Sequence, residues 1–393
     1  MKLGRRIDFD WLRIIALGLL IVTHTTYVYR TFDWRVNSLH EGLWANLVVE
    51  AMAPWRISLV FFIGGAATRF MLEAHDFGGF LRNRAMRLIV PFAMALVVLV
   101  PTMTYMADPS ARAHQDYLHF LMGDALRLHT VYGLRVPDFG HVWFLPYLFL
   151  YAMMAGLAWR FARDKFMAVN ARIAEAPVFL IVAGLAGFFI IANALLAPTF
   201  GRSNMLVNDP ASHVAGIPPF LLGLMLARAP QFWTELRRVR PILLAVTIGM
   251  LPVVMSLAVI QAQPNAAQIH GLARFVGLGD GVYGAVALFT IVGFASTALN
   301  RRAPGLQYFG DAIMPVYLLH QPVIVAAGLA LPNAGLPVWI EYPVMLVIAG
   351  GIPLIVYHVL IRPFAPMRIL FGVKAHAGGK TAPTAAGDAP HTA

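Results

Sequence analysis

The sequence predicts an all-α integral membrane protein, a bundle of about ten transmembrane helices with both termini in the cytoplasm. Hydrophobic residues make up 59% of the chain and charged residues only 12%, about half the charged share of a soluble domain. The mean hydropathy is +0.69. The lysines and arginines stand in short clusters between apolar runs, which is typical of the loops of membrane proteins.

Ten apolar stretches follow one another along the chain. Each approaches the roughly 20 residues that a helix needs to cross a bilayer. The sixth is the weakest, because it is short and opens with Pro218 and Pro219. The predicted spans are residues 11–29, 47–72, 88–107, 141–161, 176–197, 214–230, 241–261, 281–299, 313–331 and 339–361.

The basic residues support this number of spans. If the loops alternate sides, 21 lysines and arginines fall on one side and only seven on the other. The richer side is cytoplasmic by the positive-inside rule. The seven on the opposite side are Arg30, Arg35, Arg112, Arg127, Arg135, Arg202 and Arg274.

Several classes of protein are disfavoured by the same residues. The net charge of +11 forms no long basic stripe, so we expect no nucleic-acid partner. The chain has no cysteine, which excludes a disulfide, a thiolate metal site and a cysteine nucleophile. Asp8, Asp10 and Arg13 interrupt the first apolar run, so we interpret it as a retained span and not as a signal peptide.

We expect one membrane domain over residues 1–372 and a small, polar, disordered cytoplasmic tail over 373–393. The longest outer loop, about 108–140, either shapes a site from outside or is a solvated connector. It is rich in polar residues, among them Asp116, His119, Asp124, His129 and Asp138.

The first span carries the strongest candidate for chemistry. Arg13 and His24 are 11 residues apart, which is three helical turns plus about 20°, so they share a face about 16 Å apart along the axis. Asp10, three residues before Arg13, is placed to pair with it. A guanidinium at the inner mouth suits an anion such as a phosphate. A neutral imidazole deeper in the helix suits a general base, although a structural histidine bonded to a carbonyl is an equal alternative.

Arg84 and Arg87 begin the third span and are spaced i, i+3, so both project from one helix face. They are candidates for binding phosphate groups. On spacing alone, the positive-inside rule explains them better.

Two further motifs place aromatic and imidazole groups at or inside spans. His141 and Trp143 open the fourth span, where a tryptophan ordinarily anchors at the interface. Tyr317 and His320 lie inside the ninth span, and an ionisable side chain within a span is a functional candidate. Structural and functional interpretations are equally open for Tyr317 and His320.

Glu50 and Arg56 lie in or near the second span, six residues apart. Charged groups at membrane depth are expected to pair. We therefore expect a structural ion pair between them, with Glu50 supporting the site.

These residues occur in five segments that together resemble the membrane acyltransferase type 3 family, most closely the branch named for glucans biosynthesis protein C. The resemblance covers roughly residues 5–370. A further segment, HTTYVYRTFDWRVNS, resembles that branch specifically. The five segments, in order, are DFDWLRIIALGLLIVTH, FFIGG, RNRAMRLIVP, HVWFLPYL and YFGDAIMPVYLLHQP.

The resemblance implies a ten-helix bundle that moves an acyl group from cytoplasmic acyl-CoA to a hydroxyl of a periplasmic or surface glycan. It implies that His24 is the catalytic residue and forms the family's Arg-x10-His pair with Arg13. Arg84 and Arg87 match the Arg-x-x-Arg motif that is thought to hold the phosphates of CoA. The family often has serine where this chain has Gly64 and Ala312, which leaves the acceptor open.

The branch implies acetyl-CoA or succinyl-CoA as donor, no metal, and a location in the bacterial inner membrane. Membrane lipids surround the protein, and glycan-synthesis proteins are possible partners. Two other functions stay open on the sequence: a transporter or flippase for a glycan or lipid-linked intermediate, and a non-catalytic component of a glycan-synthesis complex.

Overall fold

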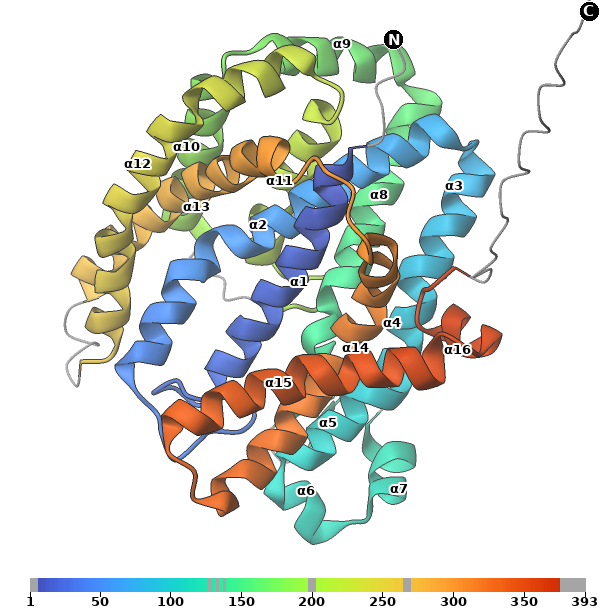
Figure 1. Cartoon of the computed structure of the whole chain (residues 1–393), viewed down its shortest axis with the longest axis vertical. Coiled ribbons are helices and arrows are strands. Elements are labelled where there is room, and N and C mark those ends of the chain that lie inside the picture. Colours follow the sequence, from blue (N-terminus) through green and yellow to red (C-terminus); the bar gives the residue numbers. More distant parts are fainter. Residues whose placement is uncertain are drawn as a thin grey trace, which may run out of the picture.

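The computed structural model describes residues 6–125, 129–131, 134–136, 139–196, 203–263 and 270–374. Most of these residues are helical, and the long helices form one bundle (Figure 1). Most of the predicted tail, residues 375–393, falls outside the described part of the chain.

The α-helices are α1 (Ile7–Tyr27), α2 (Leu43–Ala74), α3 (Phe77–Arg84), α4 (Val90–Met94), α5 (Val100–Ala107), α6 (Pro109–His114), α7 (Tyr117–His119), α8 (Phe144–Phe161), α9 (Arg163–Glu175), α10 (Val178–Leu196), α11 (Pro210–Leu226), α12 (Pro230–Gln261), α13 (His270–Ala298), α14 (Leu306–Ala330), α15 (Val338–Val356) and α16 (Ala365–Leu370). Shorter turns are η1 (Ala85–Ile89), η2 (Ala95–Leu99), η3 (Phe120–Asp124) and η7 (Tyr357–Ile361), which are π-helical, and η4 (Gly140–Trp143) and η6 (Leu331–Ala334), which are 3-10. One small hairpin pairs β1 (His129–Val131) with β2 (Leu134–Val136).

Eight helical segments of the described residues are long and apolar enough to cross a membrane. This confirms the prediction of a multi-pass, mainly helical membrane protein. The remaining two predicted spans correspond to α1, which carries several polar side chains, and to α11, which has only 17 residues. Ten crossings and cytoplasmic termini stay predictions. The eight segments are Leu43–Ala74, Phe77–Ala107, Gly140–Phe161, Val178–Leu195, Pro230–Ile260, Gly277–Ala298, Leu306–Ala330 and Val338–Ile361.

Contacts between α1 and α2 define two ends of the bundle. Near its start, α1 places the ring of Phe9 6.2 Å from that of Phe70, late in α2. Near its end, Thr23 Oγ1 lies 3.8 Å from Met52 Sδ, early in α2. The two helices are therefore antiparallel. We call the end of the bundle where α1 begins proximal and the end where α1 finishes distal.

Two other helices are oriented by similar contacts. Trp11 Nε1 donates a hydrogen bond to the carbonyl of Arg301, just before α14, so α14 begins at the proximal end and runs parallel to α1. Asp209, just before α11, contacts the first turns of α8, whereas Trp233, just after α11, packs against Phe9. Short as it is, α11 connects the distal to the proximal end.

Glycines allow α2 and α11 to cross backbone to backbone. A Cβ atom on Gly65 would lie 1.9 Å from the carbonyl oxygen of Phe220, and one on Gly223 would lie 1.9 Å from that of Phe62. Only glycine permits so close an approach, and small residues mark such helix contacts in membranes. At Gly64, a Cβ would meet Leu148 Cδ1 at 2.6 Å, but this is the end of a flexible side chain, so the crowding is less strict than at Gly65 and Gly223.

The helical segment Phe77–Ala107 begins earlier than the predicted span 88–107, so Arg84 and Arg87 lie within it. Asp76 caps its start by accepting a hydrogen bond from the Gly79 amide. Two π-helical turns, η1 and η2, precede Pro91 and Pro101. Proline removes one intrahelical hydrogen bond and crowds the preceding turn, and a π-turn accommodates the resulting break.

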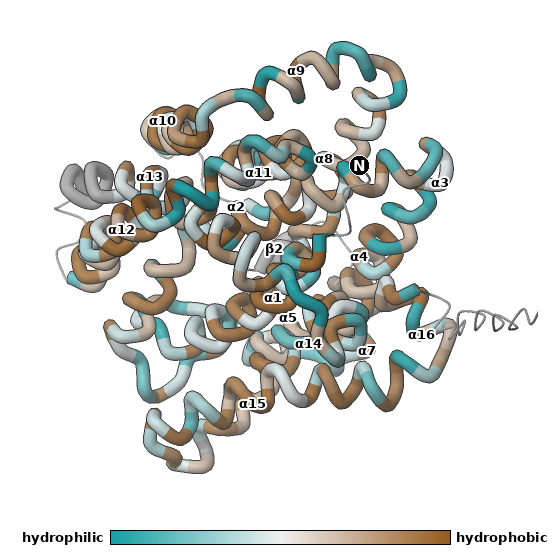
Figure 2. The backbone as a smooth tube through the Cα atoms, turned by 45° about the horizontal axis from the view of Figure 1, so that its top comes forward, coloured by the Kyte–Doolittle hydropathy of each residue, from teal (hydrophilic) through white to brown (hydrophobic). Residues whose placement is uncertain are grey.

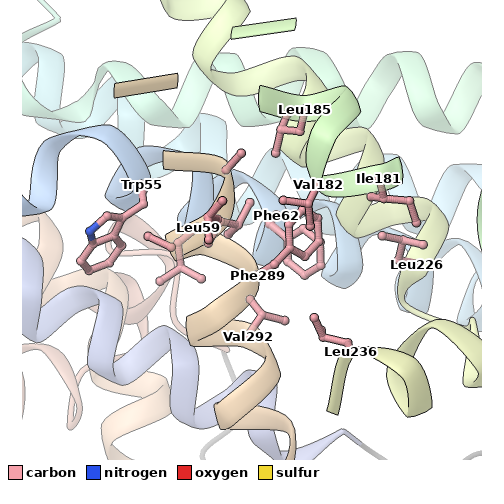
Figure 3. Packing of buried hydrophobic residues seen from close by; sticks show 14 of the residues in the cluster. Trp55, Leu59, Phe62, Ile181, Val182, Leu185, Leu226, Leu236, Phe289 and Val292 are labelled. Carbon is pink, nitrogen blue, oxygen red and sulfur yellow. The ribbon is translucent and has the colours of Figure 1, made fainter. Parts of the chain in front are cut away.

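Apolar side chains fill the bundle and also cover its outside. Figure 3 shows one buried cluster, in which Phe62 of α2 packs with Val182 of α10 and Phe289 of α13. Hydrophobic colour also extends along α10, α12 and α15 in Figure 2. Large apolar side chains on these helices, such as Ile248 and Val347, are exposed. Such a surface fits lipid and not water.

Part of the predicted outer loop forms α6, α7 and η3 at the distal end (Figure 1). Asp116 accepts a hydrogen bond from the His119 amide, and Asp124 accepts one from Gln115 Nε2. These local bonds favour the interpretation of this part as a connector. The side chains predicted at 129 and 138 lie outside the described residues.

Candidate functional site

The structure brings His24 of α1 against His320 of α14. His24 Nδ1 lies 2.8 Å from His320 Nε2, and the rings stack with their centroids 5.1 Å apart. The two residues are separated by 296 positions in the sequence and meet because α1 and α14 run parallel and in contact.

The hydrogen bonds define which nitrogen of His24 is free. His320 Nδ1 lies 2.6 Å from the carbonyl oxygen of Tyr317, and a carbonyl can only accept, so this nitrogen carries the hydrogen. In a neutral imidazole the other nitrogen is then an acceptor. His320 Nε2 therefore accepts from His24 Nδ1–H, and His24 Nε2 retains its lone pair.

The two histidines differ in burial. His24 is half-buried, whereas His320 is 0% exposed. The lone pair on His24 Nε2 is therefore the candidate acceptor for a substrate proton, and His320 Nε2 fixes the ring through the hydrogen bond from His24 Nδ1. A base held by a second hydrogen-bonded group is the arrangement found in catalytic triads. Here a neutral imidazole occupies the place of the usual carboxylate.

His141 and Tyr317 complete this cluster. The ring of His141 lies 5.4 Å from that of His320, and His141 Nε2 donates to the carbonyl of Leu318 at 2.9 Å. Tyr317 Oη donates to the carbonyl of His141 at 2.6 Å. The buried His141 Nδ1 has no hydrogen-bond partner. The sequence motifs HVWFLPYL and VYLLHQP thus meet around His320.

The candidate arginines gather towards the proximal end. Arg13 Nη1 lies 3.6 Å from Asp10 Oδ1, as the sequence predicts. Arg84 is buried and donates to Thr68 Oγ1 at 2.6 Å. It also lies within the electrostatic field of both Arg13 and Arg87. Three guanidinium groups from two helices thus form one positive region, which suits a polyanionic ligand.

The histidine cluster and the positive region lie on the same set of helices. Arg13 and His24 are both on α1, three turns apart. Helix α1 packs against α2 and α14, which supply Thr68 and His320 to the two groups. The histidine cluster and the positive region therefore lie at different depths along α1 and the helices that pack against it.

The prediction of an ion pair between Glu50 and Arg56 is wrong. Glu50 Oε1 lies 3.8 Å from Arg30 Nη2, on the segment that follows α1. Six residues along a helix correspond to 600°, so Glu50 and Arg56 face directions about 120° apart. The loop after α1 returns Arg30 to the start of α2, which spacing within α2 does not reveal.

Trp143 takes a packing position. Its ring lies 5.2 Å from Tyr147 and 6.4 Å from Phe61, within a core of partly and fully buried apolar side chains. Trp143 therefore contributes to packing between helices, and its anchoring at the membrane interface stays a prediction.

One polar network was not predicted. Asp209, buried just before α11, accepts hydrogen bonds from Tyr147 Oη at 2.6 Å, from the Asn204 amide at 2.7 Å and from the Ser212 amide at 3.2 Å. Burial alone would raise the pKa of Asp209, but these bonds outweigh it and hold the pKa below its ordinary value. The Asp-Pro pair at a helix start was the available sequence signal.

Comparisons with known proteins agree with this architecture. A family model described as an acyltransferase domain matches residues 6–358. Glucans biosynthesis protein C of Escherichia coli K12 is 22% identical over 387 residues, covering 91% of this chain and 92% of that protein. The protein of the same name from E. coli O17:K52:H18 (strain UMN026) is 21% identical over 377 residues, with the same coverage. No solved structure matches the chain. The chain belongs to the acyltransferase type 3 family, as its motifs predicted.

Proposed function

We propose that this protein transfers an acyl group, acetyl or succinyl, from cytoplasmic acyl-CoA to a hydroxyl of a periplasmic or surface glycan. Membership of an acyltransferase family and the membrane-spanning helices support the reaction class. The similarity to proteins named for glucan biosynthesis supports a glycan acceptor. The bacterial inner membrane is the location consistent with these relatives.

The observation that carries the proposal is the free Nε2 of His24 backed by His320. In the proposed reaction, His24 Nε2 takes the proton of the acceptor hydroxyl as its oxygen attacks the thioester carbonyl. The new C–O bond forms, the C–S bond breaks, and the CoA thiolate receives the proton from the imidazolium. His320 keeps the ring oriented throughout.

We assign the donor's phosphates to Arg13, Arg84 and Arg87. Phosphate oxygens suit a fixed group of guanidinium donors, and Asp10 orients Arg13 through their ion pair. With its phosphates at the proximal end, the donor's pantetheine arm would extend along α1 towards His24. The proximal end is then cytoplasmic and the distal end periplasmic, in agreement with the distribution of basic residues.

Labelled acyl-CoA tests the function directly. We expect the purified wild-type protein in detergent or vesicles to move the labelled acyl group to a periplasmic glucan preparation and release CoA. We expect His24→Ala to lose this activity while remaining folded. Glycan transport without CoA turnover would instead indicate a transporter. An active His24→Ala protein would show that His24 is structural.

A further inference from the structure

Arg56 is an arginine in the interior of α2 whose charge has no partner among the residues that the structure describes. The residue is only 5% exposed, and both Nε and Nη1 are buried without a hydrogen bond. No ion pair within the described residues includes it. Glu50, the nearest carboxylate along the helix, pairs with Arg30.

Another buried arginine of the same helix has hydrogen-bond partners for its guanidinium group. Arg69 is also 5% exposed, but its Nε donates to Glu73 at 2.7 Å and its Nη1 donates to Asn170 at 2.7 Å. A buried charge without such partners is strongly unfavourable. Arg56 therefore has the properties of a residue that awaits an anion from outside the chain.

Arg56 lies at the depth where the acyl group is expected. Met52, one turn before it on α2, contacts Thr23, next to His24. Arg56 is about 6 Å further towards the proximal end, between the level of His24 and that of the arginines that we assign to the phosphates. Its electrostatic field reaches both His24 and His320.

We propose that Arg56 binds the terminal carboxylate of a dicarboxylic acyl group, such as succinyl, and so selects the donor. This inference rests on the proposed function. A carboxylate is a ground-state anion that suits the planar fork of guanidinium donors. In succinyl-CoA it stands two methylene groups from the thioester carbonyl, within reach of a long side chain when that carbonyl is at His24. The CoA phosphates are already assigned to the proximal arginines.

Three donors isolate this carboxylate: succinyl-CoA, butyryl-CoA and acetyl-CoA. Butyryl has the same four-carbon length as succinyl but ends in a methyl group. We expect wild-type protein to prefer succinyl-CoA over butyryl-CoA, in kcat/KM with periplasmic glucan and in binding affinity. In Arg56→Met we expect the ratio of succinyl-CoA to butyryl-CoA, in kcat/KM and in affinity, to fall about 10- to 100-fold. This factor corresponds to the loss of one buried charge-assisted hydrogen bond. We expect acetyl transfer to fall far less.

The other outcomes are distinct. If Arg56→Met lowers transfer from all three donors equally, Arg56 stabilises the reaction's oxyanion instead and the proposal is wrong. It is also wrong if wild type does not distinguish succinyl-CoA from butyryl-CoA. If Arg56→Met does not fold, Arg56→Gln, which removes the charge but keeps a polar side chain, serves the same comparison. If wild type transfers no acyl group at all, the proposed function itself fails.

Discussion

At the scale of single residues, the proposed chemistry depends on which nitrogen of His24 carries a hydrogen. The answer comes from the carbonyl of Tyr317, two hydrogen bonds away. Neither His24 nor His320 needs a charge for this arrangement. A neutral relay of this kind is compatible with a site that lies at membrane depth, where a buried carboxylate would be costly.

Removing the acceptor on His320 should therefore impair catalysis more than donor binding. We expect His320→Leu to lower kcat about 100-fold, within the range of a lost acid–base contribution, with little change in the KM for acyl-CoA. His320→Gln offers an oxygen that can accept from His24 Nδ1 and should recover part of the loss. Steady-state kinetics on the purified variants measures both effects.

Tyr317→Phe is the matched control for His320. It removes the hydroxyl that donates to the His141 carbonyl but leaves the Tyr317 carbonyl that orients His320. It should retain most of the kcat. A His320→Leu protein with wild-type kcat would show that the pair is not part of the reaction.

Arg84 gives a second prediction at this scale. It lies in the field of Arg13 and Arg87, so removing its charge should weaken the binding of a polyanion. We expect Arg84→Met to weaken CoA binding about tenfold in calorimetry, the worth of one charge-assisted hydrogen bond. Arg82→Met, an exposed neighbour on the same helix, should bind CoA normally. Equal affinity in both variants would contradict the assignment.

The sequence predicted the members of the site better than their contacts. His24, His141, Tyr317 and His320 were all candidates from motif and span position, and the structure groups them. Their hydrogen bonds depend on how α1, η4 and α14 pack, which no local spacing encodes. Arg56 was misassigned for the same reason, since its expected partner lies on another face of its own helix.

At the scale of elements, the crossing of α2 and α11 sets how closely the bundle can pack. The crossing has no room for a side chain at Gly65 or Gly223. The motif FFIGG marked this position in the sequence, but the partner glycine on α11 could be found only from the packing. The prolines at 91 and 101 likewise indicated breaks in a helix without showing that π-turns resolve them.

Substituting Gly65 should separate these two helices. We expect Gly65→Ala to lower the free energy of unfolding by about 3 kcal/mol, at the upper end of overpacking effects, because its Cβ would meet the Phe220 carbonyl. Gly18→Ala on α1 is the control, since a Cβ there has nothing within 4 Å and alanine favours a helix. Thermal unfolding in detergent compares the two. Equal melting temperatures would mean that the crossing relaxes freely.

At the scale of the whole molecule, the two ends of the bundle must face different compartments if donor and acceptor are separated by the membrane. A multi-pass helical protein was predictable because charge and apolarity alternate along the whole chain, whereas the count of ten crossings stays a prediction. The contribution of α1 and α11 was less clear, since α1 is polar for a span and α11 is short. The contacts at their ends nevertheless show that each of these helices extends between the proximal and the distal end of the bundle.

The absence of cysteine makes this orientation directly measurable by single-cysteine labelling. Leu39 and Trp339 lie on distal loops or helix starts and are 82% and 72% exposed, whereas Met167 and Arg302 are exposed at the proximal end. In intact cells, a membrane-impermeant maleimide should label Leu39→Cys and Trp339→Cys. It should label Met167→Cys and Arg302→Cys only after the inner membrane is opened. If Met167→Cys and Arg302→Cys were labelled from opposite sides, the number of crossings between residues 167 and 302 would be odd. That result would exclude α11 as a span. It would also remove the separation of the two bundle ends on which transmembrane acyl transfer depends.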